Sequence, residues 1–152
     1  EICSEHGKGI FVLLRTSNPT AKQIQDVGSN DSPVWQRLAV LISGWGKPLI
    51  GEHGYSSVGA VVGATYPQEA VRVRELAPST ILLIPGYGAQ GGRAAGISGC
   101  MDNDGRGAII TSSRGVIYAF RDPKGTEAKN WGKTIADAAE VMRDDINKSL
   151  KN

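Results

Sequence analysis

The sequence predicts an α/β fold in which parallel strands alternate with helices. Near-continuous apolar runs rich in β-branched residues are typical of strands buried on both faces. Four such runs occur: GIFVLL (9–14), GAVVGA (59–64), ILLI (81–84) and GAIIT (107–111). Helical patterns lie between them, and repeated strand–helix units favour parallel pairing with right-handed crossovers.

Three longer segments have the apolar spacing and boundary residues of helices. Segment 31–46 has Pro33 just inside its start, and segment 67–78 begins with Pro67 and stops before Pro78. Segment 130–150 closes the chain, and shorter helices are expected at 21–26 and after the glycine-rich segment 86–92. The expected apolar faces are Val34, Leu38, Leu41 and Ile42 in the first helix, and Ile135, Ala138, Ala139, Met142 and Ile146 in the last.

Four strand–helix units form either a small open sheet or half of an eight-stranded barrel. The opening EICSEHGKG has the character of a last helical turn, with Gly7 at a left-handed cap position. This start favours a half barrel cut from a longer protein, so we expect residues 1–152 to be a single-domain fragment. Polar segments follow the carboxyl ends of all four strands, where barrel enzymes build their sites.

Composition argues against several classes of partner. The 17 basic and 15 acidic residues give a net charge of +2, and the basic residues form no stripe of the kind that binds nucleic acid. Apolar runs stay well below the ~20 residues of a membrane-spanning helix. Cys3 and Cys100 form no metal-ligand cluster, so we expect reduced thiols, no metal and a cytoplasmic location.

The segment GYGAQGG (86–92) matches the dinucleotide fingerprint literally, as Gly86-x-Gly88-x-x-Gly91. That fingerprint needs a sturdy helix directly after the glycines, but segment 92–107 contains five glycines and no sustained apolar period. Pro85 before Gly86 is also unusual for that tight turn. Two interpretations of this segment remain: a connecting loop, or a site for a single phosphate group.

The next strand ends in SSRG (112–115), and this favours the phosphate site. Arg114 lies between Ser113 and Gly115, one strand–helix unit after the glycine loop and the Gln90 amide. Backbone N–H groups and a forked guanidinium that converge on one point suit a phosphate dianion. In barrels the loops after the last two strands are the usual phosphate site. A structural ion pair is the alternative role for Arg114.

Four motifs in order resemble one family: FVLLRTSNP (11–19), VVGATYPQEAVRVRELAP (61–78), ILLIPGYGAQGG (81–92) and SSRGVIYA (112–119). They resemble bacterial orotidine 5′-phosphate decarboxylase of the second, mycobacterial-type class. The resemblance implies a homodimeric (β/α)8 TIM barrel, of which this chain would be strands five to eight. It also implies conversion of orotidine monophosphate to UMP and CO₂, in pyrimidine synthesis, without metal or cofactor.

The resemblance also implies roles for individual residues. Gly88, Gln90 and Gly91 match the phosphate-gripping loop, and Ser113, Arg114 and Gly115 match the phosphate arginine and its neighbours. Ser17 matches a loop over the pyrimidine ring, and Pro85 a proline beside that ring. Thr16 and Asn18 are further candidates, although they, like Ser17, could simply cap the turn before Pro19.

The family's catalytic charges, a Lys and Asp array of the D-x-K-x-x-D type, do not occur in this sequence. The acidic clusters at 102–106 and 143–148 belong to a loop before the last strand and to the face of the terminal helix. We therefore expect the catalytic residues upstream and no decarboxylase activity in this chain alone. The alternatives are another phosphate-binding barrel enzyme and a non-enzymatic half barrel that binds phosphoribosyl ligands.

Overall fold

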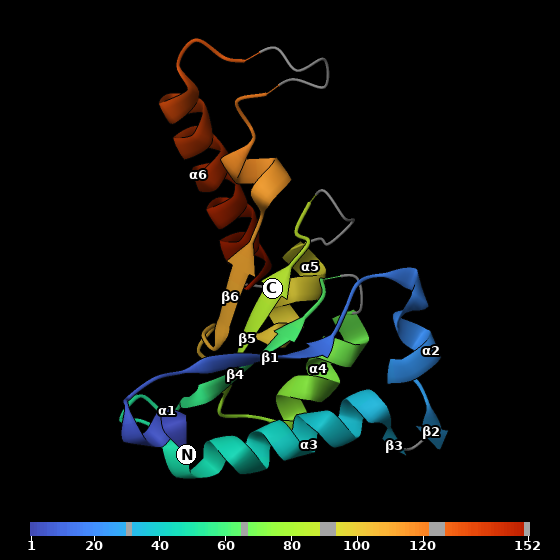
Figure 1. The fold of residues 1–152 in the computed structure, drawn as a ribbon. Helices are drawn as coiled ribbons and strands as arrows, with labels where there is room; N and C mark the ends of the chain where they lie inside the picture. The colour runs from blue at the N-terminus through green and yellow to red at the C-terminus, as the bar shows by residue number, and fades with distance from the viewer. Residues whose placement is uncertain (30–31, 65–66, 89–93, 122–126, 151–152) are drawn as a thin grey trace.

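The computed structural model describes residues 1–29, 32–64, 67–88, 94–121 and 127–150. Its main sheet has four parallel strands in the order β1-β4-β5-β6 (Figure 1). Their bounds are β1 Ile10–Arg15, β4 Ser56–Val62, β5 Thr80–Pro85 and β6 Ala108–Thr111. The four predicted strands and their parallel pairing are confirmed, with β4 beginning three residues before the predicted start at 59.

Helices connect these strands as the sequence predicts. The longer ones are α3 Val34–Gly46, α4 Pro67–Leu76 and α6 Trp131–Ser149. The shorter ones are α1 Ile2–Glu5, α2 Lys22–Gln25 and α5 Ala94–Ile97, with 3₁₀ turns at 19–21, 47–49 and 98–100. A small antiparallel pair, β2 Gly28–Ser29 and β3 Ser32–Pro33, precedes α3 and was not predicted. Among the described helices none is both long and apolar enough to cross a membrane.

The core lies between one face of the sheet and the helices α3 and α4. Along β4 and β5 the side chains of Val58, Ala60, Val62, Leu82 and Ile84 are buried, and they pack with side chains of both helices. The other face is less covered, and Leu13 is 61% exposed. The prediction of strands buried on both faces therefore fails for β1 and β6, because the described helices cover one face only.

Two helices bury their predicted apolar faces only in part, since Ile42 of α3 and Ile146 of α6 are buried as predicted but other members of both faces are not. In α3 the buried side chains include Trp35, Ala39 and Ile42, whereas Leu41 on the predicted face is half exposed. This helix is apolar on two sides, and the sheet takes the side that carries the tryptophan. In α6 only Ile146 is buried, because α6 packs on α5 and on the turn after β6 rather than on the sheet.

The start of the chain follows its sequence pattern. The short helix α1 ends before Gly7, whose φ of 58° is the left-handed conformation that favours glycine. Cys3 is partly exposed and Cys100 is buried, and both are free thiols. Burial raises the pKa of the Cys100 thiol to about 11, so this group is an inert part of the core.

Candidate functional site

Backbone hydrogen bonds join the carboxyl ends of all four parallel strands. At the end of β4, the Gly63 N–H donates to the Arg15 carbonyl at 2.8 Å, and the Ala64 N–H donates to the Pro85 carbonyl at 3.0 Å. Pro85 also pairs in register with Thr111 of β6. Because the strands are parallel, the segments that follow them emerge along one edge of the sheet, as the sequence predicts.

The loops after β5 and β6 enclose a cavity of about 120 Å³. Gly86 and Gly88 have φ values of 97° and 71°, so each position requires the freedom of glycine. This volume is below the ~300–1,000 Å³ typical of pockets for whole small molecules, and it suits a single group such as a phosphate. The lining residues are Pro85, Gly86, Tyr87, Thr111, Ser112, Ser113 and Arg114.

Arg114 lies in a π-helical turn, Ser113–Ile117, directly after β6. Its side chain is exposed, and within the described parts of the chain its guanidinium has no hydrogen-bond or ion-pair partner. The alternative of a structural ion pair therefore finds no support among these residues. Gly115 is close to Ser112, since a Cβ atom at 115 would lie 2.7 Å from the Ser112 hydroxyl oxygen. The predicted Gln90 and Gly91 lie outside the described residues.

Tyr87 anchors α6 beside this cavity. Its hydroxyl donates to the carboxylate of Asp145, and burial together with this hydrogen bond raises the pKa of Tyr87 to about 12. A second cavity of about 440 Å³ lies between the π-helical turn and α6. Tyr87 and Ser112 line both cavities, and Gly88 and Gly115 line the second one. The glycine loop and the arginine turn thus share both cavities.

The segment after β1 forms a compact turn. The Thr16 N–H donates to the Gln25 side-chain carbonyl at 3.2 Å, and the Gln25 amide donates back to the Thr16 hydroxyl at 3.2 Å. The Asn18 amide donates to the Thr20 hydroxyl at 2.8 Å. Thr16 and Asn18 therefore have turn-forming contacts, which is the alternative that the sequence left open for them. Ser17, partly buried between them, faces Gly63 at the end of β4.

Comparisons with known proteins support the family resemblance. No family model matches the sequence. The chain is 38% identical over 149 residues to orotidine 5′-phosphate decarboxylase of Rhodopirellula baltica, which covers 96% of this chain and 49% of that protein. It is 39% identical over 153 residues to the Clostridium tetani enzyme of the same name, with 100% and 52% covered. The chain is homologous to orotidine 5′-phosphate decarboxylases.

Solved structures agree with the sequence matches. The structure of Leishmania donovani OMP decarboxylase superposes with a TM-score of 0.69 at 29% identity, over 95% of this chain and 49% of that one. The chain spans about half the length of the curated decarboxylases it matches. The four motifs thus identified the right homologues.

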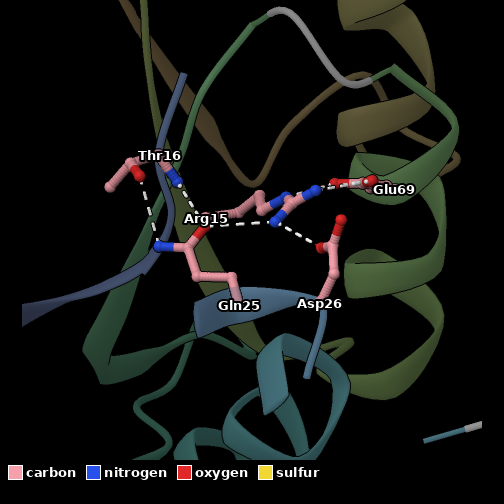
Figure 2. A network of polar contacts seen from close by, with 5 residues as sticks. All are labelled: Arg15, Thr16, Gln25, Asp26 and Glu69. Atoms are coloured by element: carbon pink, nitrogen blue, oxygen red, sulfur yellow. Dashed lines mark hydrogen bonds and ion pairs between the residues drawn. The ribbon is translucent and has the colours of Figure 1, made fainter. Parts of the chain in front are cut away.

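A buried arginine at the end of β1 is the main feature that the sequence analysis missed (Figure 2). Arg15 is 0% exposed and donates to Glu69 of α4 through Nε at 2.5 Å and through a terminal nitrogen at 3.0 Å. The same guanidinium pairs with Asp26 at 2.7 Å and donates to the Gln25 carbonyl at 3.2 Å. Burial alone would lower the pKa of Arg15, but the hydrogen bonds to Glu69 and Asp26 raise it above its ordinary value. A charged residue ending an otherwise apolar strand was the available signal.

Of the two acidic clusters, 143–148 contacts the glycine loop, since Asp145 accepts the hydrogen bond from Tyr87, whereas 102–106 lies away from that loop and from Arg114. Asp102 accepts a hydrogen bond from Tyr55 and others from the backbone N–H groups of Asp104 and Arg106, which lowers its pKa. This turn precedes β6, at the amino ends of the strands. In the part of the chain that the structure describes, no group of three or more His, Cys, Asp or Glu side chains could hold a metal ion.

Proposed function

We propose that this chain is the substrate-gripping half of an orotidine 5′-phosphate decarboxylase of the mycobacterial-type class. The single observation that carries the proposal is that Pro85 and Arg114 line the same cavity. The two residues come from two of the motifs that resemble the decarboxylase family. The left-handed Gly86 and Gly88 beside it open the backbone to an anion, and the Arg114 guanidinium is unpaired among the described residues. Such an arrangement suits a phosphate dianion.

Each site residue has a proposed role in binding orotidine monophosphate or UMP. Arg114, flanked by Ser113 and Gly115, pairs with the phosphate, and the loop with Gly88, Gln90 and Gly91 supplies further donors. Pro85 packs beside the pyrimidine ring, and Ser17 covers it from the β1 side. Thr16 and Asn18 hold the Ser17 turn through their contacts with Gln25 and Thr20.

The four strands correspond, in this proposal, to strands five to eight of a (β/α)8 barrel. The less covered sheet face, which includes Phe11, Leu13 and Ile109, then points into the barrel interior. The edge strands β1 and β6 pair with strands of the other half, which closes the barrel and removes both edges. Residues 1–152 form one domain fragment, and the intact enzyme is a cytoplasmic homodimer.

The reaction needs groups that this chain does not supply. Loss of CO₂ from C6 of the pyrimidine leaves a carbanion, which a lysine stabilises electrostatically and then protonates. The lysine and its aspartate partners belong to the other half. This chain contributes phosphate binding, which is remote from C6, and remote binding energy orients the reacting ring. No metal or cofactor takes part in the proposed reaction.

A chimera tests this assignment. The segment of the Rhodopirellula baltica decarboxylase that matches this chain is replaced by residues 1–152, and the purified chimera is assayed for UMP formed from orotidine monophosphate. We expect activity in the chimera and none in the isolated chain. A chimera that folds, by circular dichroism, but neither binds UMP nor forms it would contradict the proposal.

A further inference from the structure

The Arg15 network connects three segments that are distant in sequence. Arg15 ends β1, Gln25 and Asp26 end the helix α2 that follows the Ser17 turn, and Glu69 lies in the first turns of α4 (Figure 2). Glu69 accepts two hydrogen bonds from the guanidinium fork, and this bidentate geometry fixes direction as well as distance. The network therefore sets how the Ser17 turn lies relative to α4.

Stability alone is a weak reason for such a network. A buried ion pair often contributes no more stability than well-packed apolar side chains of similar volume, because the charges lose their hydration. Arg15 is fully buried, while Asp26 and Glu69 are partly exposed at 38% and 26%. Such a network can instead favour one conformation over close alternatives.

Contacts continue from Arg15 to both sides of Ser17. On one side Gln25 accepts from Arg15 and exchanges two hydrogen bonds with Thr16, the residue before Ser17. On the other side a Cβ atom at Gly63 would lie 3.0 Å from both the Ser17 backbone nitrogen and its Cβ. Ser17 is therefore held between the Arg15 network and the end of β4, with no room for a larger residue at 63.

The end of β4 extends this arrangement to Pro85. Gly63 donates to the carbonyl of Arg15 itself, and its neighbour Ala64 donates to the carbonyl of Pro85. Ser17 and Pro85, the two residues assigned to the base, are thus connected through two consecutive residues of one strand end. Arg114 and the π-helical turn lie outside this set of contacts.

We propose that Arg15 is a positioning residue for the base-binding side of the site, which holds the Ser17 turn against Gly63 and thereby at a fixed place relative to Pro85. The inference rests on the proposed function for its ligand, a pyrimidine nucleotide. It assigns Arg15 to recognition of the base and not to recognition of the phosphate.

The test compares Arg15→Lys with the unmodified chain. Lysine keeps the positive charge for Glu69 and Asp26 but cannot form the bidentate fork. Amide hydrogen exchange, followed by NMR, should become faster at Thr16 and Ser17 and stay unchanged at Leu82 in the sheet. If Arg15→Lys fails to fold, Glu69→Gln serves as the second variant. It keeps the side-chain shape, and it should show the same faster exchange at Thr16 and Ser17. Unchanged exchange at Thr16 and Ser17 in a folded variant would overturn the inference.

Ligand titration separates the base from the phosphate. UMP should bind about tenfold more weakly to Arg15→Lys than to the unmodified chain, a loss of binding free energy about equal to that of one hydrogen bond. Ribose 5-phosphate should bind equally well to the two proteins. A merely destabilising change would weaken both ligands, and this result would also overturn the inference. Arg72 is an exposed arginine on the same helix as Glu69, and Arg72→Lys is the matched control. It should change neither the affinity for UMP nor that for ribose 5-phosphate.

Failure of the proposed function would look different. An unmodified chain that binds neither UMP nor ribose 5-phosphate would remove the assignment of the ligand. The exchange rates at Thr16 and Ser17 would still decide whether Arg15 holds the turn, because they require no ligand.

Discussion

The Ser112 hydroxyl donates a hydrogen bond of 3.2 Å to the Tyr87 carbonyl and so connects the loop after β5 with the end of β6. Parallel pairing alone already brings Pro85 opposite Thr111. The side-chain bond extends this contact beyond the paired residues, to the segments that line the small cavity. Because a Cβ atom at Gly115 would contact the Ser112 hydroxyl oxygen, this bond also depends on glycine at 115.

Replacing Ser112 by alanine should weaken phosphate binding without unfolding the chain. A neutral hydrogen bond contributes about 0.5–1.5 kcal/mol, so we expect a loss of affinity for inorganic phosphate of about two- to tenfold. Calorimetric titration of the chain with inorganic phosphate measures this affinity. Ser29→Ala, in an exposed strand away from the cavity, is the control. Equal affinity in the Ser112 variant would show that the two loops do not depend on this bond.

Arg114→Ala tests the principal phosphate contact. Loss of a charged hydrogen bond in the chimera should lower kcat/KM for orotidine monophosphate, and the corresponding loss of transition-state stabilisation should be at least ~2 kcal/mol. Arg114→Lys should restore part of this loss, because it keeps the charge but not the fork. Arg106→Ala removes an exposed arginine from the turn before β6 and should have little effect. Unchanged kinetics in Arg114→Ala would exclude the phosphate role.

Arg74 should be a stability residue rather than a site residue. Its guanidinium donates to the carbonyls of Cys100, Pro78, Thr80 and Gly107 at 2.7–3.0 Å, where the amino ends of the strands meet α4. Arg74→Met leaves these carbonyls without that donor, and we expect the free energy of unfolding to fall by about 3 kcal/mol. Urea unfolding measures the change, with the exposed Arg72→Met as control. A loss no larger than the control's would contradict this role.

The fold could be predicted because its signals are local. Apolar runs placed the four strands, and the segments after them were expected at one edge of the sheet because parallel strands end there together. That reasoning needs only chain order and periodicity, and it predicted that the glycine loop and Arg114 meet, as Gly86 and Arg114 do in one cavity. The roles of Pro85 and Ser17, in contrast, came only from the family resemblance.

The Arg15 network could not be predicted in the same way. Arg15 and Glu69 are 54 residues apart, and a chain with 17 basic and 15 acidic residues offers many possible pairs. Which pair forms depends on how α4 returns across the sheet, which is a tertiary property. The buried face of α3 has the same difficulty, since apolar residues occur on two sides of that helix and packing on the sheet selects Trp35 over Leu41.

Alkaline pH should loosen α6 through Tyr87. Burial and the hydrogen bond to Asp145 raise the pKa of Tyr87 from 10.0 to about 12 in the folded chain. The folded state therefore holds this proton more tightly than the unfolded state. Its contribution to stability is complete below pH 10 and is lost as the pH rises to about 12. Ionisation of Tyr87 removes the hydroxyl proton that it donates to Asp145, and so removes the hydrogen bond that holds α6. The ionised side chain would also face the negative carboxylate of Asp145.

Urea unfolding of the chain between pH 8 and pH 11.5 measures this loss. Tyr87→Phe cannot titrate, so its stability should be lower at pH 8 and should fall less steeply above pH 10 than that of the unmodified chain. Tyr118→Phe, at an exposed tyrosine of the turn after β6, should follow the unmodified chain. Parallel curves for Tyr87→Phe and the unmodified chain would show that the raised pKa of Tyr87 does not contribute to stability. In that case the attachment of α6 would depend on Ile146 and the Ser149 hydrogen bond to Ala94 instead.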